Sequence, residues 1–253
     1  MGLGAASGFG CRRRRWTPPP GTEYPGLGLI FSESFDTECP EGQFLDVYGK
    51  KWTAYPKGWE DTSKKGNYNP DIISVRNGVM NMRLHTENGA PQVAAPEPKI
   101  NGNNELNQLY GRYEMRFRAD PVSGYKLAWL LWPKSEIWPR DGEIDAPEGN
   151  LTGTISAFMH RQGAAAGSDQ AQFSTTAGFN DWHVLAYEWT PTRFEVFLDT
   201  KSIGCATARI LNTPMRWVLQ SETELNKTYP AQNAVANVQC DYVKAWRYTG
   251  KAA

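Results

Sequence analysis

The sequence of 253 residues contains no long apolar run, no excess of charge and no closely spaced pair of cysteines. No apolar segment approaches the ~20 residues that a membrane-spanning helix needs, so we expect no membrane partner. Lys and Arg number 27 and Asp and Glu also number 27, so the overall charge does not favour nucleic acid as a partner. The four cysteines lack C-x-x-C spacing, which disfavours a zinc or redox site, and any pairing among Cys39, Cys205 and Cys240 stays open.

The start of the chain lacks the pattern of a folded segment. Glycines, alanines and prolines surround Cys11 and the four consecutive arginines Arg12 to Arg15. Blocks of like charge are usually solvated, so we predict a disordered tail over 1–24, with contact to phosphate or an anionic glycan as the alternative. A signal peptide is not visible, because Trp16 and then prolines follow where an apolar segment is required. One folded domain is predicted over 25–250.

Aromatic residues and period-two alternation are abundant. The 10 Trp, 11 Tyr and 10 Phe can supply core side chains and flat apolar platforms that suit the faces of sugar rings. Asn77-Gly78 predicts a two-residue hairpin between 73–76 and the strand that follows. Many antiparallel strands without an internal repeat predict an all-β sandwich or barrel, and not a propeller or solenoid. The alternation recurs at 79–85, 112–118, 154–160, 184–189, 194–198 and 238–248.

One acidic segment combines closely spaced carboxylates with a proline. On a strand, Glu143 and Asp145 point to the same face, because side chains alternate. Strict alternation turns Glu148 to the other face, but Pro147 is poorly tolerated in a regular ladder. A β-bulge at Ala146-Pro147 absorbs one residue and returns Glu148 to the face of the first two acids. The segment therefore predicts three carboxylates in a row on one side of one strand.

Three acids in a row destabilise a sheet unless a function uses them. Like charges raise the pKa of at least one member, which lets a glycosidase keep one acid protonated and another ionised near neutral pH. Four strand steps of ~3.3 Å separate the outer α-carbons by roughly 13 Å. If Glu143 and Glu148 lean toward each other, their carboxyl groups approach the ~5–5.5 Å of a retaining glycosidase, with Asp145 between them to orient the nucleophile.

The acidic segment resembles the active-site strand of glycoside hydrolase family 16, whose longer motif is E-x-D-x-x-E. The lead-in Trp138-Pro139-x-x-Gly142 resembles the W-P-x-x-G of laminarinase-like members of that family. The resemblance spans roughly 28–248, and the extra residue before the last glutamate argues against the short-motif branch of lichenases and xyloglucan transglycosylases. Further similar stretches are Tyr110 to Glu114, Trp182-His183, Glu188-Trp189 and Asp241 to Val243.

The resemblance implies a fold and three roles. The fold is a jelly-roll β-sandwich of the concanavalin A-like type. Glu143 is implied as the nucleophile, Asp145 as the assisting acid and Glu148 as the general acid/base. Many laminarinase-like members carry a bulky apolar residue in place of Pro147 and an aromatic residue or His in place of Gly149. These departures leave the substrate within the family open.

Several tryptophans and one asparagine are candidates for sugar binding. Trp138 lies directly before the acids, as in the family, and is the best candidate for a platform under a sugar ring. Trp129 and Trp132 are three residues apart and face opposite sides of a regular strand, so we expect only one of these two candidates to line the cleft. Asn69 resembles a family position that contacts the sugar on the nucleophile side.

Three polar residues on other predicted strands are further candidates. Gln220 and Glu222 place two polar groups on one face of an otherwise apolar strand, either lining the cleft or forming a hydrogen-bonded pair in the core. His160 follows polar Thr154 and Ser156 on its own face. We expect it near Glu148, where it binds a sugar hydroxyl or tunes a proton, with a structural role as the alternative.

Catalysis of this kind requires no cofactor, and metal sites are weakly indicated. Counted from Asp141, an EF-hand loop would need Gly and an acid where Ala146 and Thr152 stand, so the acidic segment does not match that calcium motif. Asp241, together with Glu33 or Asp36, is the candidate for a structural calcium, as in some family members.

The sequence as a whole predicts a retaining, endo-acting glycoside hydrolase that cleaves a β-linked polysaccharide by double displacement. The expected substrate is β-1,3-glucan. The alternatives are a galactan hydrolase of the same family, acting on agar or carrageenan, and a carbohydrate-binding protein of lectin type without turnover. We expect a monomer whose partner is the polysaccharide, and an extracellular location because of that substrate class.

Overall fold

The computed structural model of the protein describes residues 24–102, 105–226 and 228–250. Apart from Tyr24, the predicted tail over 1–24, with Cys11 and Arg12 to Arg15, lies outside the described residues. No helix in these ranges is both long and apolar enough to cross a membrane. The described cysteines Cys39, Cys205 and Cys240 are all free thiols.

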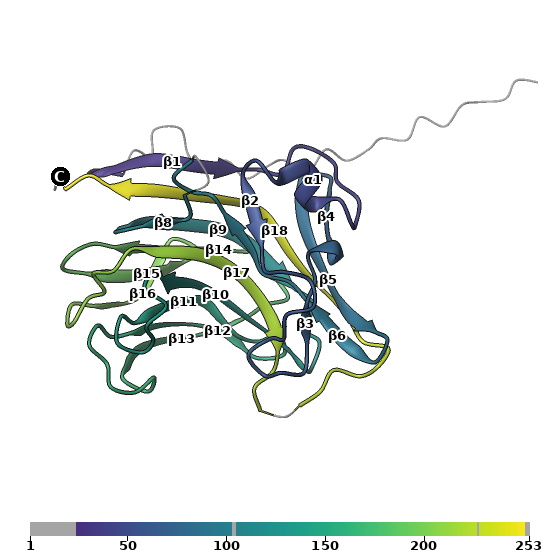
Figure 1. Ribbon diagram of the computed structural model, residues 1–253. Coiled ribbons are helices and arrows are strands. Elements are labelled where there is room, and N and C mark those ends of the chain that lie inside the picture. The colour runs from purple at the N-terminus through teal and green to yellow at the C-terminus, as the bar shows by residue number, and fades with distance from the viewer. Residues whose placement is uncertain (1–23, 103–104, 227, 251–253) are drawn as a thin grey trace, which may run out of the picture.

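Two curved sheets stacked as layers form the molecule, so the predicted all-β jelly-roll sandwich is confirmed (Figure 1). The first sheet has ten strands: β1 (Leu27–Glu33), β3 (Asn67–Tyr68), β4 (Ile73–Arg76), β5 (Val79–Glu87), β6 (Ala90–Val93), β9 (Gly111–Ala119), β14 (His183–Trp189), β15 (Phe194–Leu198), β16 (Lys201–Ala206) and β18 (Val235–Tyr248). The second has six, in the order β13 (Gln170–Gly178), β12 (Thr154–His160), β11 (Glu143–Asn150), β10 (Tyr125–Pro133), β17 (Met215–Thr223) and β8 (Asn107–Gln108).

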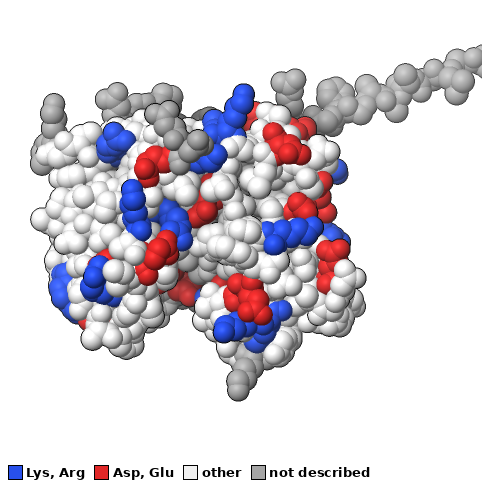
Figure 2. All heavy atoms as spheres, in the orientation of Figure 1, with Lys and Arg blue, Asp and Glu red and all other residues white. Residues whose placement is uncertain are grey.

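Smaller elements close one side of the sandwich. A two-stranded sheet joins β2 (Trp52–Ala54) to β7 (Pro96–Pro98), next to the short helix α1 (Phe44–Tyr48) and the 3-10 turn η1 (Pro70–Ile72). On the face shown in Figure 2, acidic and basic side chains are interspersed without a continuous field of either sign. This pattern agrees with the balanced composition of the chain.

The predicted alternation is confirmed in the strands. Met80, Met82 and Leu84 of β5 are buried, and their neighbours in the strand are more exposed, because alternate side chains point to opposite faces. The predicted hairpin between β4 and β5 is also confirmed. Asn77 and Gly78 both have positive φ, 55° and 75°, and connect the antiparallel pair that begins with Arg76 opposite Val79.

The core lies between the two sheets and is dominated by large aromatic side chains. Phe117 of β9 packs against Trp129 of β10 with ring centroids 5.4 Å apart, and Tyr113 meets the edge of Trp217 at 5.2 Å. Each of these side chains is fully buried. Burial of such a side chain stabilises the fold by about 1.5–3 kcal/mol, so these contacts between the sheets contribute to holding the two layers together.

Strand β11 contains the predicted bulge. Asp145 pairs with Leu130 and Glu148 pairs with Ala128, so three steps along β11 correspond to two steps along β10. The same count holds on the other side, where Asp145 pairs with Phe158 and Glu148 with Ser156 of β12. One residue at Ala146-Pro147 is therefore extra, and the predicted bulge is confirmed.

Gly142, directly before the acids, is required by the backbone. Its φ is +71°, and a β-carbon there would overlap the side chain of Leu211 and the carbonyl oxygen of His160. We expect Gly142→Ala to lower the free energy of unfolding by about 2 kcal/mol or more, measured by urea denaturation. Gly58→Ala is the control, since its φ is +89° but nothing lies within 4 Å of an added β-carbon. It should cost only about 1 kcal/mol. Equal losses in the two variants would contradict the overlap.

Candidate active site

The three acids of β11 lie on the face of the six-stranded sheet that is turned away from the core. Ile144 and Ala146, which directly follow Glu143 and Asp145, are fully buried in the core. Glu143 and Asp145 are 9% and 4% exposed, and the side chain of Glu148 is 24% exposed. The bulge therefore brings the three carboxylates to one face, at the floor of a groove.

Two cavities flank the row of acids. The aromatic cavity, about 410 Å³, contains Glu143 in its wall, and the polar cavity, about 240 Å³, contains Glu148. The aromatic cavity is lined by Tyr55, Trp59, Glu60, Asp61, Thr62, Tyr68, Leu130, Trp132, Trp138, Glu143 and Gln220. The polar cavity is lined by Lys126, Glu148, Gly149, Asn150, Ser156, Phe158, Leu225 and Asn226.

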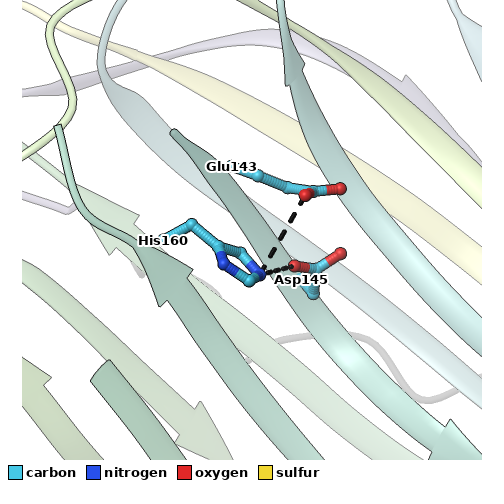
Figure 3. Close-up of side chains that lie close together, drawn as sticks. All are labelled: Glu143, Asp145 and His160. Atoms are coloured by element: carbon cyan, nitrogen blue, oxygen red, sulfur yellow. Dashed lines mark ion pairs between the residues drawn. The ribbon is translucent and has the colours of Figure 1, made fainter. Parts of the chain in front are cut away.

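His160 reaches from β12 toward two of the acids (Figure 3). Its Nε2 lies 3.3 Å from Oδ2 of Asp145 and 4.0 Å from Oε2 of Glu143. Its Nδ1 is 2.6 Å from the carbonyl oxygen of Gly167, which can only accept a hydrogen bond. If Nδ1 carries a hydrogen for this bond, Nε2 can donate a second hydrogen bond to Asp145 only when the ring is protonated to imidazolium. Burial opposes that charge, but the hydrogen bond and charge of Asp145 outweigh it and raise the pKa of His160.

Burial and mutual repulsion raise proton affinity in the row of acids. The pKa of Glu143 lies well above its ordinary value, first because the carboxyl is buried and then because Asp145 and Glu148 are close. Burial and the charge of Asp145 also raise the pKa of Glu148. Like charges this close oppose the ionisation of all three acids at once. The raised pKa of Glu148 has the direction predicted for the acid that protonates the leaving oxygen, whereas the raised pKa of Glu143, the predicted nucleophile, was not predicted.

The structure also places one set of potential metal ligands. Among the described residues, Glu143, Asp145 and His160 each offer an atom within 4.8 Å of the others. These atoms belong to the hydrogen-bonded group at the centre of the groove. The contacts of His160 with both carboxylates account for their proximity without an ion.

The tryptophan candidates separate into groove and core. Trp138 is 42% exposed and lines the aromatic cavity, as does Trp132, whose indole N–H donates to Glu136 at 2.6 Å. Trp129 is fully buried against Phe117, so its candidacy as a sugar-binding residue is wrong. The reason is the strand period, because residues three apart on β10 point to opposite faces.

Asn69 and Glu222 are buried and hydrogen-bonded within the protein, so the prediction that they contact sugar is wrong. Asn69 is 2% exposed, donates to Oε1 of Gln92 and accepts the backbone N–H of Asp71, which caps η1. Glu222 is 1% exposed and accepts hydrogen bonds from Thr62 and from the hydroxyl of Tyr68.

Gln220 and Glu222 resolve the alternative that the sequence left open. Only Gln220 lines the aromatic cavity, whereas Glu222 belongs to the hydrogen-bonded layer beneath the groove.

The structure places two further candidates. His160, predicted near Glu148, pairs in register with Glu143 and contacts Asp145, and its charge also lowers the pKa of Glu148. Asp241, the calcium candidate, forms an ion pair with Arg116 at 2.8 Å, and Glu33 accepts the N–H groups of Ser34 and Phe35 and pairs with Lys51. These carboxylates have partners among the described residues, and the calcium site predicted at Asp241 stays a prediction.

Sequence reasoning missed several residues of the groove, among them Trp59, Tyr55 and Lys126. Trp59 is 57% exposed and lines the aromatic cavity together with Tyr55, from a loop before β3. Lys126 is the second residue of β10, and its ammonium group is 2.8 Å from Oε1 of Glu148. The signal for Lys126 was a charged residue inside the apolar run of Tyr125–Pro133. Such a residue is seldom buried in a strand without a charged partner.

A two-layer jelly-roll with a row of carboxylates between an aromatic and a polar cavity is a fold and site of the type found in carbohydrate-active proteins. The sequence of residues 60–244 matches the model of the family described as glycosyl hydrolases family 16. The match covers most of the chain, so this chain belongs to glycosyl hydrolase family 16.

Two curated proteins are similar to this chain in sequence. The chain is similar to a beta-glucanase of Rhodothermus marinus, with 26% identity over 193 residues, which is 69% of this chain and 64% of that protein. It is also similar to the endo-1,3-1,4-beta-glycanase ExsH of Rhizobium meliloti, with 22% identity over 245 residues, which is 87% of this chain and 52% of that protein. The chain thus spans between half and two thirds of the length of these relatives.

Solved structures share the fold at low identity. A LamA variant from Z. galactanivorans, in complex with laminaritriose and laminaritetraose, is 20% identical with a TM-score of 0.66, covering 87% of this chain and 99% of that one. The laminarinase catalytic domain of Thermotoga maritima is 16% identical with a TM-score of 0.68, covering 87% of this chain and 98% of that one.

Proposed function

We propose that this protein is an endo-acting glycosidase that hydrolyses a β-linked glucan with retention of anomeric configuration. One observation carries the proposal: the bulge at Ala146-Pro147 returns Glu148 to the face of Glu143 and Asp145, between two open cavities. Paired carboxyl groups on either side of a glycosidic bond are the chemistry of most glycosidases. The membership in glycosyl hydrolase family 16 supports the same conclusion.

The roles follow from the position of each acid in the row. Glu143 attacks the anomeric carbon as a carboxylate while Glu148 gives its proton to the leaving oxygen. Water then enters, Glu148 takes one of its protons, and the oxygen displaces Glu143 from the sugar. Asp145 lies between them and accepts a hydrogen bond from Nε2 of His160, which also lies 4.0 Å from Oε2 of Glu143, so these contacts orient the nucleophile.

The two cavities support endo action on a chain of sugars. A polysaccharide that lies across the row occupies the aromatic cavity on the Glu143 side and the polar cavity on the Glu148 side. Trp59, Trp132 and Trp138 offer apolar surfaces that stack on sugar rings, and Gln220 can pair with hydroxyl groups. For the linkage we propose β-1,3-glucan. The support is the likeness to a beta-glucanase and to a structure that binds laminaritriose.

A panel of polysaccharides tests this proposal. Reducing ends released from laminarin, lichenan, agarose and κ-carrageenan are measured with the purified protein. We expect the largest rate on laminarin and, by NMR early in the reaction, a β-configured product. A preference for agarose or κ-carrageenan would favour the galactan alternative. Binding without turnover on every member of the panel would favour a lectin-like protein, and an α-configured first product would contradict double displacement.

A further inference from the structure

Lys126 is a buried cation in the wall of the polar cavity. Its side chain is 8% exposed, and its Nζ donates to Oε1 of Glu148 at 2.8 Å and lies 3.9 Å from Oε2 of Glu222. An ammonium group is buried at high cost unless anionic partners compensate it. Burial lowers the pKa of Lys126, but the charges of Glu148 and Glu222 outweigh burial and raise it, so the group stays charged.

The strand register explains how Lys126 reaches Glu148. Lys126 lies directly opposite Glu222 on β17, and the residue opposite Glu148 is Ala128, two positions further along β10. Lys126 is therefore a diagonal neighbour of Glu148, a separation that only a long side chain spans. Ala128 has a side chain of one carbon, so it does not fill the path between them.

Glu222 fixes the other side of this cation. Its Oε1 accepts the backbone N–H of Thr62 at 3.1 Å, the hydroxyl of Thr62 at 2.5 Å and the hydroxyl of Tyr68 at 2.9 Å. Three donors on one oxygen hold the carboxylate in place and leave Oε2 toward Lys126. The ammonium group thus lies between the hydrogen-bonded carboxylate of Glu222 and the carboxyl group of Glu148.

We propose that Lys126 is a positioning residue for Glu148: it holds Oε1, leaves the other carboxyl oxygen for proton transfer in the groove, and stabilises the ionised form. The proposal rests on the proposed function of Glu148 as general acid/base. No feature of the E-x-D-x-x-E motif supplies this contact, because Lys126 lies on a different strand.

Lys126 affects the two proton transfers of Glu148 in opposite directions. When Glu148 transfers its proton to the glycosidic oxygen, the bond from that oxygen to the anomeric carbon breaks, and a carboxylate forms 2.8 Å from the ammonium group. Lys126 favours this step because it stabilises the anion that forms. It opposes the second step, in which the carboxylate must take a proton from water, so it adjusts Glu148 between acid and base.

Several charged groups surround the carboxyl of Glu148, and Lys126 is the strongest positive one. Asp145 of its own strand raises its pKa, whereas Lys126 of β10 and then His160 of β12 lower it. Glu222 of β17 faces Lys126 from the other side. Burial and Asp145 raise the pKa of Glu148, and Lys126 lowers it. Removal of the positive charge of Lys126 should therefore raise the pKa of Glu148.

Titration of Glu148 by carbon-13 NMR tests the proposal without turnover. The carboxyl signal is assigned in glutamate-labelled protein by its loss in Glu148→Gln. We expect Lys126→Met to raise the midpoint by about one pH unit or more, because an adjacent opposite charge lowers a carboxyl pKa by roughly 1–3 units. Lys126→Arg should stay near the wild type. Lys201→Met, which removes a lysine at the start of β16, is the matched control and should not shift it.

The outcomes separate this inference from the proposed function. An unchanged or lower midpoint in a folded Lys126→Met protein overturns the role of Lys126, whatever the activity. Lys126→Gln replaces it if the methionine variant does not fold, with the same expected rise. On a hydrolysed glucan, the alkaline limb of the kcat/KM profile should move to higher pH by the same amount in these variants. If the wild type hydrolyses no member of the panel, the proposed function fails. The NMR titration still shows whether Lys126 lowers the pKa of Glu148.

Discussion

Replacement of Glu143 by glutamine is expected to lower kcat for glucan hydrolysis by on the order of 10⁴-fold or more, because an amide of the same shape cannot attack the anomeric carbon. Glu143 is 9% exposed and lies in a crowded row of acids, so loss of its charge relieves repulsion from Asp145 and Glu148. The free energy of unfolding should therefore stay at or above that of the wild type. Initial rates and urea denaturation of the same preparations measure both effects.

A matched variant is available for this experiment. Glu41 is an exposed glutamate that lies outside the two cavities beside the acids. Glu41→Gln should hydrolyse the glucan at the rate of the wild type. Turnover by Glu143→Gln within tenfold of Glu41→Gln would show that another group is the nucleophile.

Glu148→Ala is expected to lose activity to a degree that depends on the leaving group. With polysaccharide, the rate should fall on the order of 10³-fold, because no acid protonates the leaving oxygen. With an aryl β-glycoside whose phenol is acidic, the first step needs little assistance, and the glycosyl-enzyme accumulates. Azide should then restore turnover and give a β-glycosyl azide, since it enters on the side that Glu148 occupied, beside the cation of Lys126.

The configuration of the azide product distinguishes the two glutamates. In Glu143→Ala, azide attacks the substrate directly from the vacated side and should give the α-glycosyl azide. Both products are identified by the coupling of the anomeric proton in NMR. An α-azide from Glu148→Ala, or no response to azide in either variant, would contradict the assigned roles.

Local rules were sufficient to predict the row of acids from the sequence. Side-chain alternation placed Glu143 and Asp145 together, and the intolerance of a ladder for Pro147 indicated the bulge that the register shows. The hairpin at Asn77-Gly78 was predictable for the same reason, since its conformation depends on two adjacent residues. Each of these features depends on neighbours within a few positions of the chain.

The surroundings of the acids could not be predicted in the same way, because they come from distant strands. Lys126 and Glu222 are 96 positions apart in the sequence and become opposite each other only through the pairing of β10 with β17. Alternation separated Trp129 from Trp132, but only the register with β11 shows which of them faces the core. Asn69 resembled a sugar-binding position, yet its amide is used to cap η1.

The single extra residue in β11 allows the acidic motif to have two different lengths. Counted on the facing strand, Glu148 lies opposite Ala128 and Ile144 opposite Leu131. A segment shortened by one residue at 146–147 would follow strict alternation and set its last glutamate on that same rung, facing the same way. Loss of this one extra residue is thus neutral for the face on which the acids lie and alters only the local bend of the backbone. Two motif lengths can in this way produce one arrangement of carboxylates.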